Sequence, residues 1–183
     1  MTRTRSSGGR DLILVHSSDL HVDDDRIAAQ HNGDGTAGLR AALATARAFG
    51  AGVVLLAGDT FDNHMITAAT IDRAGQLLAD AGVPVVLLPG NHDPLTGDSV
   101  YRRGGFEQIA GLHILGLTDG EAVEFPEHGL EIWGRAHRDS SSRSPPLRPP
   151  REPTRRWFTW LPSWLTPTRR SSERNSTRNA AGT

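Results

Sequence analysis

The chain has 183 residues, which is enough for one domain with a substantial hydrophobic core. It contains no cysteine, which excludes disulfides, thiolate metal sites and a cysteine nucleophile, and all of its basic side chains apart from histidine are arginine. The apolar run before His16 is too short for a signal peptide or a membrane span, so we expect a soluble cytoplasmic protein with no membrane contact.

Charge is distributed unevenly along the chain, although the formal net charge is only −1. Residues 1–138 carry 11 arginines and 18 acidic residues, whereas residues 139–183 carry 9 arginines and 3 acidic residues. The second segment also holds seven of the 11 prolines and three of the four tryptophans. The sequence therefore predicts a flexible N-terminus over residues 1–10, a folded domain over 11–138 and a basic tail over 139–183.

The first half of the domain alternates between strands and helices. Residues 12–16 read as a buried strand followed by an acidic loop. The next segment is apolar at helical spacing and ends at two glycines; the stripe is Leu39, Ala42, Leu43, Ala46 and Phe49. Residues 53–57 then read as a second buried strand.

The same alternation continues through the second half. Residues 67–82 have a helical apolar stripe and end at a glycine; the stripe is Ile71, Ala74, Leu77 and Leu78. The run "PVVLL" predicts a third strand, residues 101–110 a short helix, and "LHILGL", "AVEF" and "LEIWG" three more short strands.

This order of continuous apolar strands and helices is typical of a parallel α/β sheet that is covered on both faces. Each of the first three strands ends in a polar loop, "SSDLHVD", "GDTFDN" or "GNHD". In such sheets the binding residues collect beyond the carboxyl ends of the strands, and neighbouring strands lie about 4.8 Å apart. We therefore expect the three loops to converge on one small site.

The side chains of these loops are suited to divalent metals. Carboxylate, imidazole and amide oxygen bind ions such as Mn²⁺, Fe²⁺ or Zn²⁺. Asp19 and His21 are two residues apart, so in an extended segment they face the same side and can hold one ion. Asp59 can bridge two ions and Asn91 can hold the second. Two ions together clamp a phosphate and activate a water molecule.

The ordered motifs D-x-H, G-D-x-x-D and G-N-H-D resemble those of the calcineurin-like metallophosphoesterase superfamily. The resemblance implies an αββα sandwich with two metals, in which Asp19 and His21 bind the first ion, Asp59 bridges both and Asn91 binds the second. It implies catalytic roles for His92, which stabilises the phosphate or protonates the leaving oxygen, and for Asp93, which orients His92.

Within this superfamily, "VHSSDLHVD" and "GDTFDN" look most similar to the DNA-repair exonucleases of the SbcD type. Val22 and Asp23 stand where the phosphatases usually have glycine. The resemblance implies a manganese-dependent phosphodiester hydrolase, with DNA as substrate and an ATPase subunit as partner. A phosphatase or nucleotide phosphodiesterase of the same superfamily is the alternative, and the oligomeric state is not indicated.

One part of the superfamily's pattern is missing. A further lone histidine and a G-H-x-H motif should follow and supply more metal ligands, but no histidine follows His137. The resemblance therefore covers residues 12–138 at most, and it implies an incomplete second sheet. With fewer ligands, we expect the protein to bind its metals more weakly and its activity to be impaired. A non-catalytic remnant that binds only metal or nucleic acid is the alternative interpretation.

The tail is rich in serine, proline, threonine and arginine and is predicted to be disordered. We interpret it as a truncated or frameshifted end of a longer nuclease, because GC-rich genes read out of frame give these residues. Its arginines together with Trp157, Trp160 and Trp164 also fit nucleic-acid binding. A third interpretation is that the tryptophans dock on the exposed sheet.

The remaining histidines give weaker signals. His64 and His137 are candidates for substrate contact because of their places after strands. His16 is expected to be packed or half-buried and His31 to lie on a surface loop, while His113 and His128 have no neighbours in the sequence that suggest a metal site.

Overall fold

The computed structural model describes residues 12–23, 25–63, 65–140 and 156–159. The segment 1–10 and most of the predicted tail lie outside these residues, so their boundaries stay predictions. The described residues form a four-stranded parallel sheet, a second sheet of three strands, and helices, which confirms the predicted α/β class.

The four-stranded sheet has the order β1-β2-β3-β4, the same order as in the sequence. Its strands are β1 (Leu14–Ser17), β2 (Val53–Ala57), β3 (Val85–Leu88) and β4 (Leu112–Ile114). Every residue of β2 and β3 is buried, which explains why these strands are apolar without alternation. At the edge strand β1, His16 is exposed and its neighbours are half-buried.

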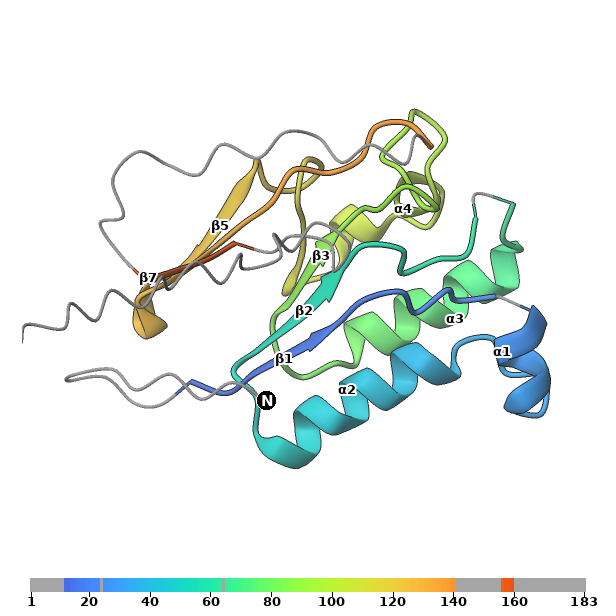
Figure 1. Ribbon diagram of the computed structural model, residues 1–183, viewed down its shortest axis with the longest axis horizontal. Coiled ribbons are helices and arrows are strands. Elements are labelled where there is room, and N and C mark those ends of the chain that lie inside the picture. The colour runs from blue at the N-terminus through green and yellow to red at the C-terminus, as the bar shows by residue number, and fades with distance from the viewer. Residues whose placement is uncertain (1–11, 24, 64, 141–155, 160–183) are drawn as a thin grey trace, which may run out of the picture.

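The helices connect these strands along one face of the sheet. They are α1 (Asp25–Gln30), α2 (Ala37–Phe49), α3 (Ala68–Ala79), α4 (Val100–Arg103) and the 3₁₀ helix η1 (Phe106–Gln108). Figure 1 shows α2 and α3 on one side of β1, β2 and β3, with the second sheet on the other side. Right-handed crossovers between strands that advance in one direction place the connecting helices α2 and α3 on the same face.

Three details of the helices differ from the sequence predictions. Phe49, predicted as part of the apolar stripe of α2, is 54% exposed, because it lies in the last turn beyond the edge of the core. The predicted helix over 101–110 is broken into α4 and η1 at Gly104 and Gly105, where Gly105 has a φ of 61°. Helix α1 was not predicted; none of its residues is buried.

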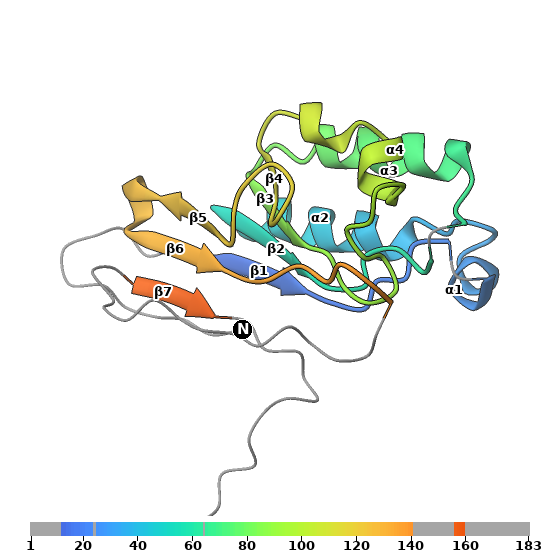
Figure 2. The same cartoon turned by 90° about the horizontal axis from the view of Figure 1, so that it is seen from above.

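The second sheet contains β5 (Ala122–Phe125), β6 (Leu130–Trp133) and β7 (Arg156–Thr159), with a 3₁₀ turn, η2 (Pro126–His128), between the first two. Strands β5 and β6 are antiparallel, and β7 lies parallel to β6 with Leu130 opposite Arg156. Figure 2 shows β6 and β7 side by side. Residues 156–159 were predicted to be disordered; they form a strand here, and aromatic and β-branched residues beside an open strand edge favour this pairing.

The two sheets share one hydrophobic core. Phe125 of β5 makes an edge-to-face contact with His113 of β4, with ring centroids 5.6 Å apart. Gly134 lies just past β6, where an added Cβ would sit 3.1 Å from Leu115 and from Leu88. This close approach holds the segment after β6 against the carboxyl end of β3, where the loops of interest begin.

Candidate metal centre

The loops after β1, β2 and β3 run side by side beyond the ends of their strands. The N–H of Asp19 donates to the carbonyl of Gly58 at 3.2 Å, and the N–H of His21 donates to the carbonyl of Asp59 at 3.1 Å. The N–H of Gly58 in turn donates to the carbonyl of Leu88 at 2.9 Å. The parallel pairing of the strands therefore continues into the loops and brings the predicted site residues together.

The backbone is strained where these residues lie. Five non-glycine residues among those the structure describes have a positive φ, and four of them are in the first two loops: Asp19 (54°), His21 (43°), Asp23 (78°) and Asp59 (50°). Each such conformation costs on the order of 1–3 kcal/mol and persists only where the surroundings enforce it. Three of the four are predicted metal ligands, so the strain coincides with the predicted site.

Asp19, His21 and Asp59 form a triad of metal-binding groups. One ligand atom from each lies within 4.8 Å of the others, with Asp19 exposed and the other two half-buried. We refer to this group as the acidic triad. Its geometry agrees with the predicted convergence of the first two loops, and its two carboxylates and one imidazole are a ligand set for a divalent cation.

The third loop lies against the acidic triad at Asp59. An added Cβ on Gly90 would sit 2.1 Å from Oδ1 of Asp59 and 2.4 Å from its backbone nitrogen. The N–H of His92 donates to the same Oδ1 at 3.0 Å. Asn91 stands between these two residues in the sequence and is half-buried, and its role as a metal ligand stays a prediction.

Asp93, predicted to orient His92, is a buried carboxylate at the start of the third loop. Its carboxylate is 2% exposed and accepts hydrogen bonds from the N–H of Gly90 (2.7 Å), the N–H of Phe61 (3.0 Å) and the hydroxyl of Tyr101 (2.6 Å). Burial raises the pKa of Asp93, and the bond from Tyr101 followed by the two backbone bonds opposes the rise. The carboxylate thus joins the second loop to the third, and the three groups that it binds do not include the His92 ring.

His92 is oriented instead by a residue that the sequence analysis did not include among the site residues. Nδ1 of His92 lies 2.9 Å from the backbone carbonyl of Asp62. Because a carbonyl only accepts hydrogen bonds, Nδ1 carries the proton and Nε2 is left to act on a ligand. Asp62 is the second acid of the G-D-x-x-D motif, but the group that holds His92 is its backbone carbonyl, which the motif does not single out.

The other histidines lie in varied surroundings. His137 is 8% exposed and lies beside the third loop. Its backbone N–H donates to the carbonyl of Pro89, and its carbonyl accepts a hydrogen bond from the N–H of Leu95. Nδ1 of His113 lies 3.2 Å from Asp119, and His31 is exposed. His64, a candidate for substrate contact, lies outside the described residues.

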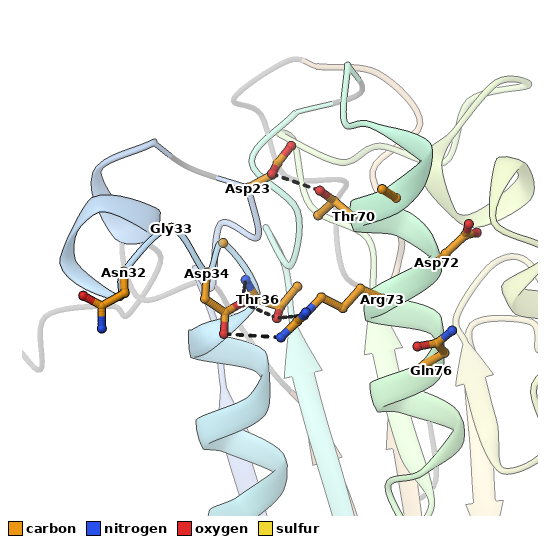
Figure 3. A pocket seen from close by; sticks show the side chains of 11 residues that line it. Asp23, Asn32, Gly33, Asp34, Thr36, Thr70, Asp72, Arg73 and Gln76 are labelled. Carbon is orange, nitrogen blue, oxygen red and sulfur yellow. Dashed lines mark hydrogen bonds and ion pairs between the residues drawn. The ribbon is translucent and has the colours of Figure 1, made fainter.

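A separate cavity of about 690 Å³ lies between the start of α2 and the first turns of α3 (Figure 3). Thr70 donates to the Asp23 carboxylate at 3.1 Å, and Nε of Arg73 donates to the Thr36 hydroxyl at 3.2 Å. Asp34 accepts bonds from the hydroxyl and N–H of Thr36 and pairs with Arg40. These pairs link the residues that line the cavity, and Asp23 is the lining residue that belongs to the first loop.

Several features of the described residues fit a divalent cation. Two carboxylates of the acidic triad face each other within 4.8 Å, which is unfavourable without a positive charge between them. Gly90 packs so closely against Asp59 that a Cβ there would clash with it, and this close approach holds the third loop at the triad. Nδ1 of His21 is buried without a hydrogen-bond partner among the described residues. The residues present therefore suit a metal site of oxygen and nitrogen ligands.

A comparison with models of protein families identifies the family of the chain. The family model described as calcineurin-like phosphoesterase matches residues 12–173, which runs past residue 138, where the sequence analysis ended the domain. A search of curated proteins found no match. Among the described residues no helix is long and apolar enough to span a bilayer.

Proposed function

The chain belongs to the calcineurin-like phosphoesterase family of metal-dependent phosphoesterases, and we propose that it hydrolyses phosphodiester bonds in DNA. The observation that carries the proposal is the convergence of the acidic triad with Asn91 and His92 at the ends of three adjacent parallel strands. This arrangement suits phosphodiester hydrolysis because it places metal ligands beside His92, a side chain that can carry a proton.

The metal ligands in this proposal are Asp19, His21, Asp59 and Asn91, and the ions are two Mn²⁺. When bound, such cations supply the positive charge that polarises a phosphate and activates a water molecule. The protein contributes a rigid set of ligands, since the backbone bonds between the loops fix Asp19, His21 and Asp59 before any ion arrives. Carboxylate-rich sites favour manganese over softer metals.

His92 is the proton donor to the leaving oxygen in this proposal. Its Nδ1–H is held by the carbonyl of Asp62, so Nε2 is the nitrogen that delivers the proton. The ring is exposed and therefore reachable by a substrate. Asp93 acts as a positioning residue, because its carboxylate fixes Gly90 and thereby the loop that carries His92.

DNA is the substrate in this proposal because the first two loops resemble those of the exonuclease branch. Val22 is fully buried and pairs with Phe61, and Asp23 adopts a left-handed conformation where a phosphatase would have glycine. The same resemblance supports an ATPase subunit as partner and the cytoplasm as the compartment. Hydrolysis of nucleotides or phosphoproteins is the alternative within the family.

The test uses a radiolabelled DNA duplex and bis-p-nitrophenyl phosphate, each with and without Mn²⁺. We expect manganese-dependent hydrolysis of both, reduced by roughly a hundredfold or more in Asp59→Asn and in His92→Gln. Asp72→Asn is the matched control, because Asp72 is an exposed acid on α3 away from the three loops. Hydrolysis of the small ester without DNA cleavage would reject DNA as substrate, and no turnover with any divalent metal would favour the non-catalytic alternative.

A further inference from the structure

A second cluster of metal-binding side chains lies next to the acidic triad. It consists of His21, Asp62 and His92, which contribute one ligand atom each within 4.8 Å of one another. We refer to it as the histidine triad. The proposed reaction uses only the backbone carbonyl of Asp62, so its carboxylate has no role in that reaction.

The contact between His21 and Asp62 has the spacing of two metal ligands. Nδ1 of His21 lies 3.2 Å from Oδ1 of Asp62, yet it makes no hydrogen bond with any described residue. A tetrahedral zinc ion, with bonds of about 2.0–2.1 Å, holds its ligand atoms about 3.3 Å apart. The two atoms are therefore close enough to share an ion but are not aligned to share a proton.

His92 is already arranged as a metal ligand of this triad. Its Nδ1–H donates to the carbonyl of Asp62 at 2.9 Å, and metal-binding histidines commonly donate their second N–H to such a group. Nε2 therefore keeps the lone pair that binds a metal. The His92 ring meets that of His21 edge-on, with centroids 4.8 Å apart.

The Asp62 carboxylate is also held in place. Its Oδ2 accepts a bond of 2.9 Å from the side-chain amide of Asn63, which leaves Oδ1 facing His21. Ligating carboxylates are typically hydrogen-bonded in this way. Since His92 is exposed, an ion can reach the triad, and solvent can occupy the fourth position.

We propose that the histidine triad is a zinc site that competes with the manganese site at the acidic triad. Two imidazoles and one carboxylate favour zinc, whereas two carboxylates and one imidazole favour manganese. A neutral imidazole has one lone pair, so His21 can serve only one triad at a time. An ion that binds His21 in one triad therefore excludes His21 from the other.

Zinc in this site would also inhibit the proposed reaction. It occupies the Nε2 lone pair of His92, so His92 can no longer carry a proton to the leaving oxygen. This inhibitory effect and the competition with manganese rest on the proposed function, whereas zinc binding at the histidine triad does not.

Isothermal titration calorimetry on the untagged full chain tests the proposal. Asp62→Asn should weaken zinc binding by at least about tenfold and change manganese affinity by less than about threefold. Asp19→Asn should show the opposite pattern. Saturating manganese should weaken zinc binding to the unmodified protein.

His92→Gln is a second variant, because its exposed side chain can be replaced without loss of the fold, as circular dichroism would check. It should also weaken zinc binding. Unchanged zinc affinity in both Asp62→Asn and His92→Gln would overturn the proposal, as would simultaneous binding of zinc and manganese without mutual weakening. Absence of hydrolysis together with the expected binding pattern would reject the proposed function and leave the zinc site intact.

Discussion

The N–H of His92 donates a 3.0 Å hydrogen bond to Oδ1 of Asp59, the acid at the centre of the site. This bond ties the loop after β3 to the loop after β2 at the atoms where a metal would bind. The bond also uses one lone pair of Oδ1 of Asp59. The other carboxylate oxygen, Oδ2, therefore has more lone pairs available to bind a metal. The loop that carries His92 and the carboxylate of Asp59 are therefore fixed relative to each other by a backbone hydrogen bond.

Gly90→Ala should displace this loop. The new methyl group would lie 2.1 Å from Oδ1 of Asp59, a distance that no packing adjustment of a side chain alone relieves, since the Asp59 backbone nitrogen is only 2.4 Å away. We expect a loss of about 2–4 kcal/mol in the free energy of unfolding, measured by urea denaturation, and loss of metal-dependent hydrolysis.

Gly97→Ala is the matched control, because an added Cβ at this exposed position has no atom within 4 Å. It should change the free energy of unfolding by less than about 0.5 kcal/mol. Equal stability of the two alanine variants would show that the third loop does not lie against Asp59.

Asp93→Asn should destabilise the protein even though it preserves shape. The carboxylate accepts bonds from Gly90, Phe61 and Tyr101, and an amide places a donor against one of these donors. We expect a cost of about 2–3 kcal/mol, and about 1–2 kcal/mol for Tyr101→Phe, which removes one donor. Chemical denaturation measures the free energy of unfolding of both variants, and Asp72→Asn is the exposed control. If Asp93→Asn lost no more stability than this control, the Asp93 carboxylate would not be holding the two loops together.

Local sequence patterns were sufficient to predict the acidic triad. Asp19, His21 and Asp59 follow apolar strands directly, and parallel neighbours necessarily end at the same edge of the sheet. The partners of Asp93 were not predictable in this way, because Phe61 is 32 residues away and its contact arises only when two loops fold together. The sequence analysis used Asp62 as part of a motif but assigned it no role, since its carbonyl acts on His92 and a carbonyl is present in every residue.

The exposed end of α2 and the strand β7 differ from the predictions because both depend on contacts with distant parts of the chain, which local patterns do not show. A helical stripe defines a face but not where the core ends, so the last member of the stripe, Phe49, was predicted to be buried. Composition predicted disorder over the tail, whereas pairing of residues 156–159 with β6 depends on an open strand edge far away in the sequence.

Asp34→Asn should weaken the start of α2 in a pH-dependent manner. Hydrogen bonds from the Thr36 hydroxyl and N–H, and then from Arg40, lower the pKa of Asp34, while partial burial opposes them. A lowered pKa in the folded state means that Asp34 stabilises the fold above its ordinary pKa of 3.8 and loses this effect as the pH falls through the lowered value.

We therefore expect Asp34→Asn to be about 1 kcal/mol less stable than the unmodified protein at pH 7, with a difference that shrinks below about pH 4. Thermal unfolding between pH 3 and pH 7 measures it. Asp72→Asn is the control, because Asp72 lines the same cavity with an exposed side chain (Figure 3). A difference that stays constant over this range would show that the charge of Asp34 is not the cause.

Manganese should stabilise the protein through the acidic triad. A ligand that binds only the folded state at a hundred times its dissociation constant adds about 2.7 kcal/mol to the free energy of unfolding, and a chelator should remove this gain. Asp19→Asn should lose the gain, because it removes a ligand. Without metal, the same variant should be more stable than the unmodified protein by about 0.5–2 kcal/mol, since Asp19 and Asp59 then no longer repel each other within 4.8 Å. Denaturation with EDTA and with Mn²⁺ separates these two effects. If Asp19→Asn proved less stable than the unmodified protein in EDTA, the two carboxylates would be held by interactions within the protein and not poised for a cation.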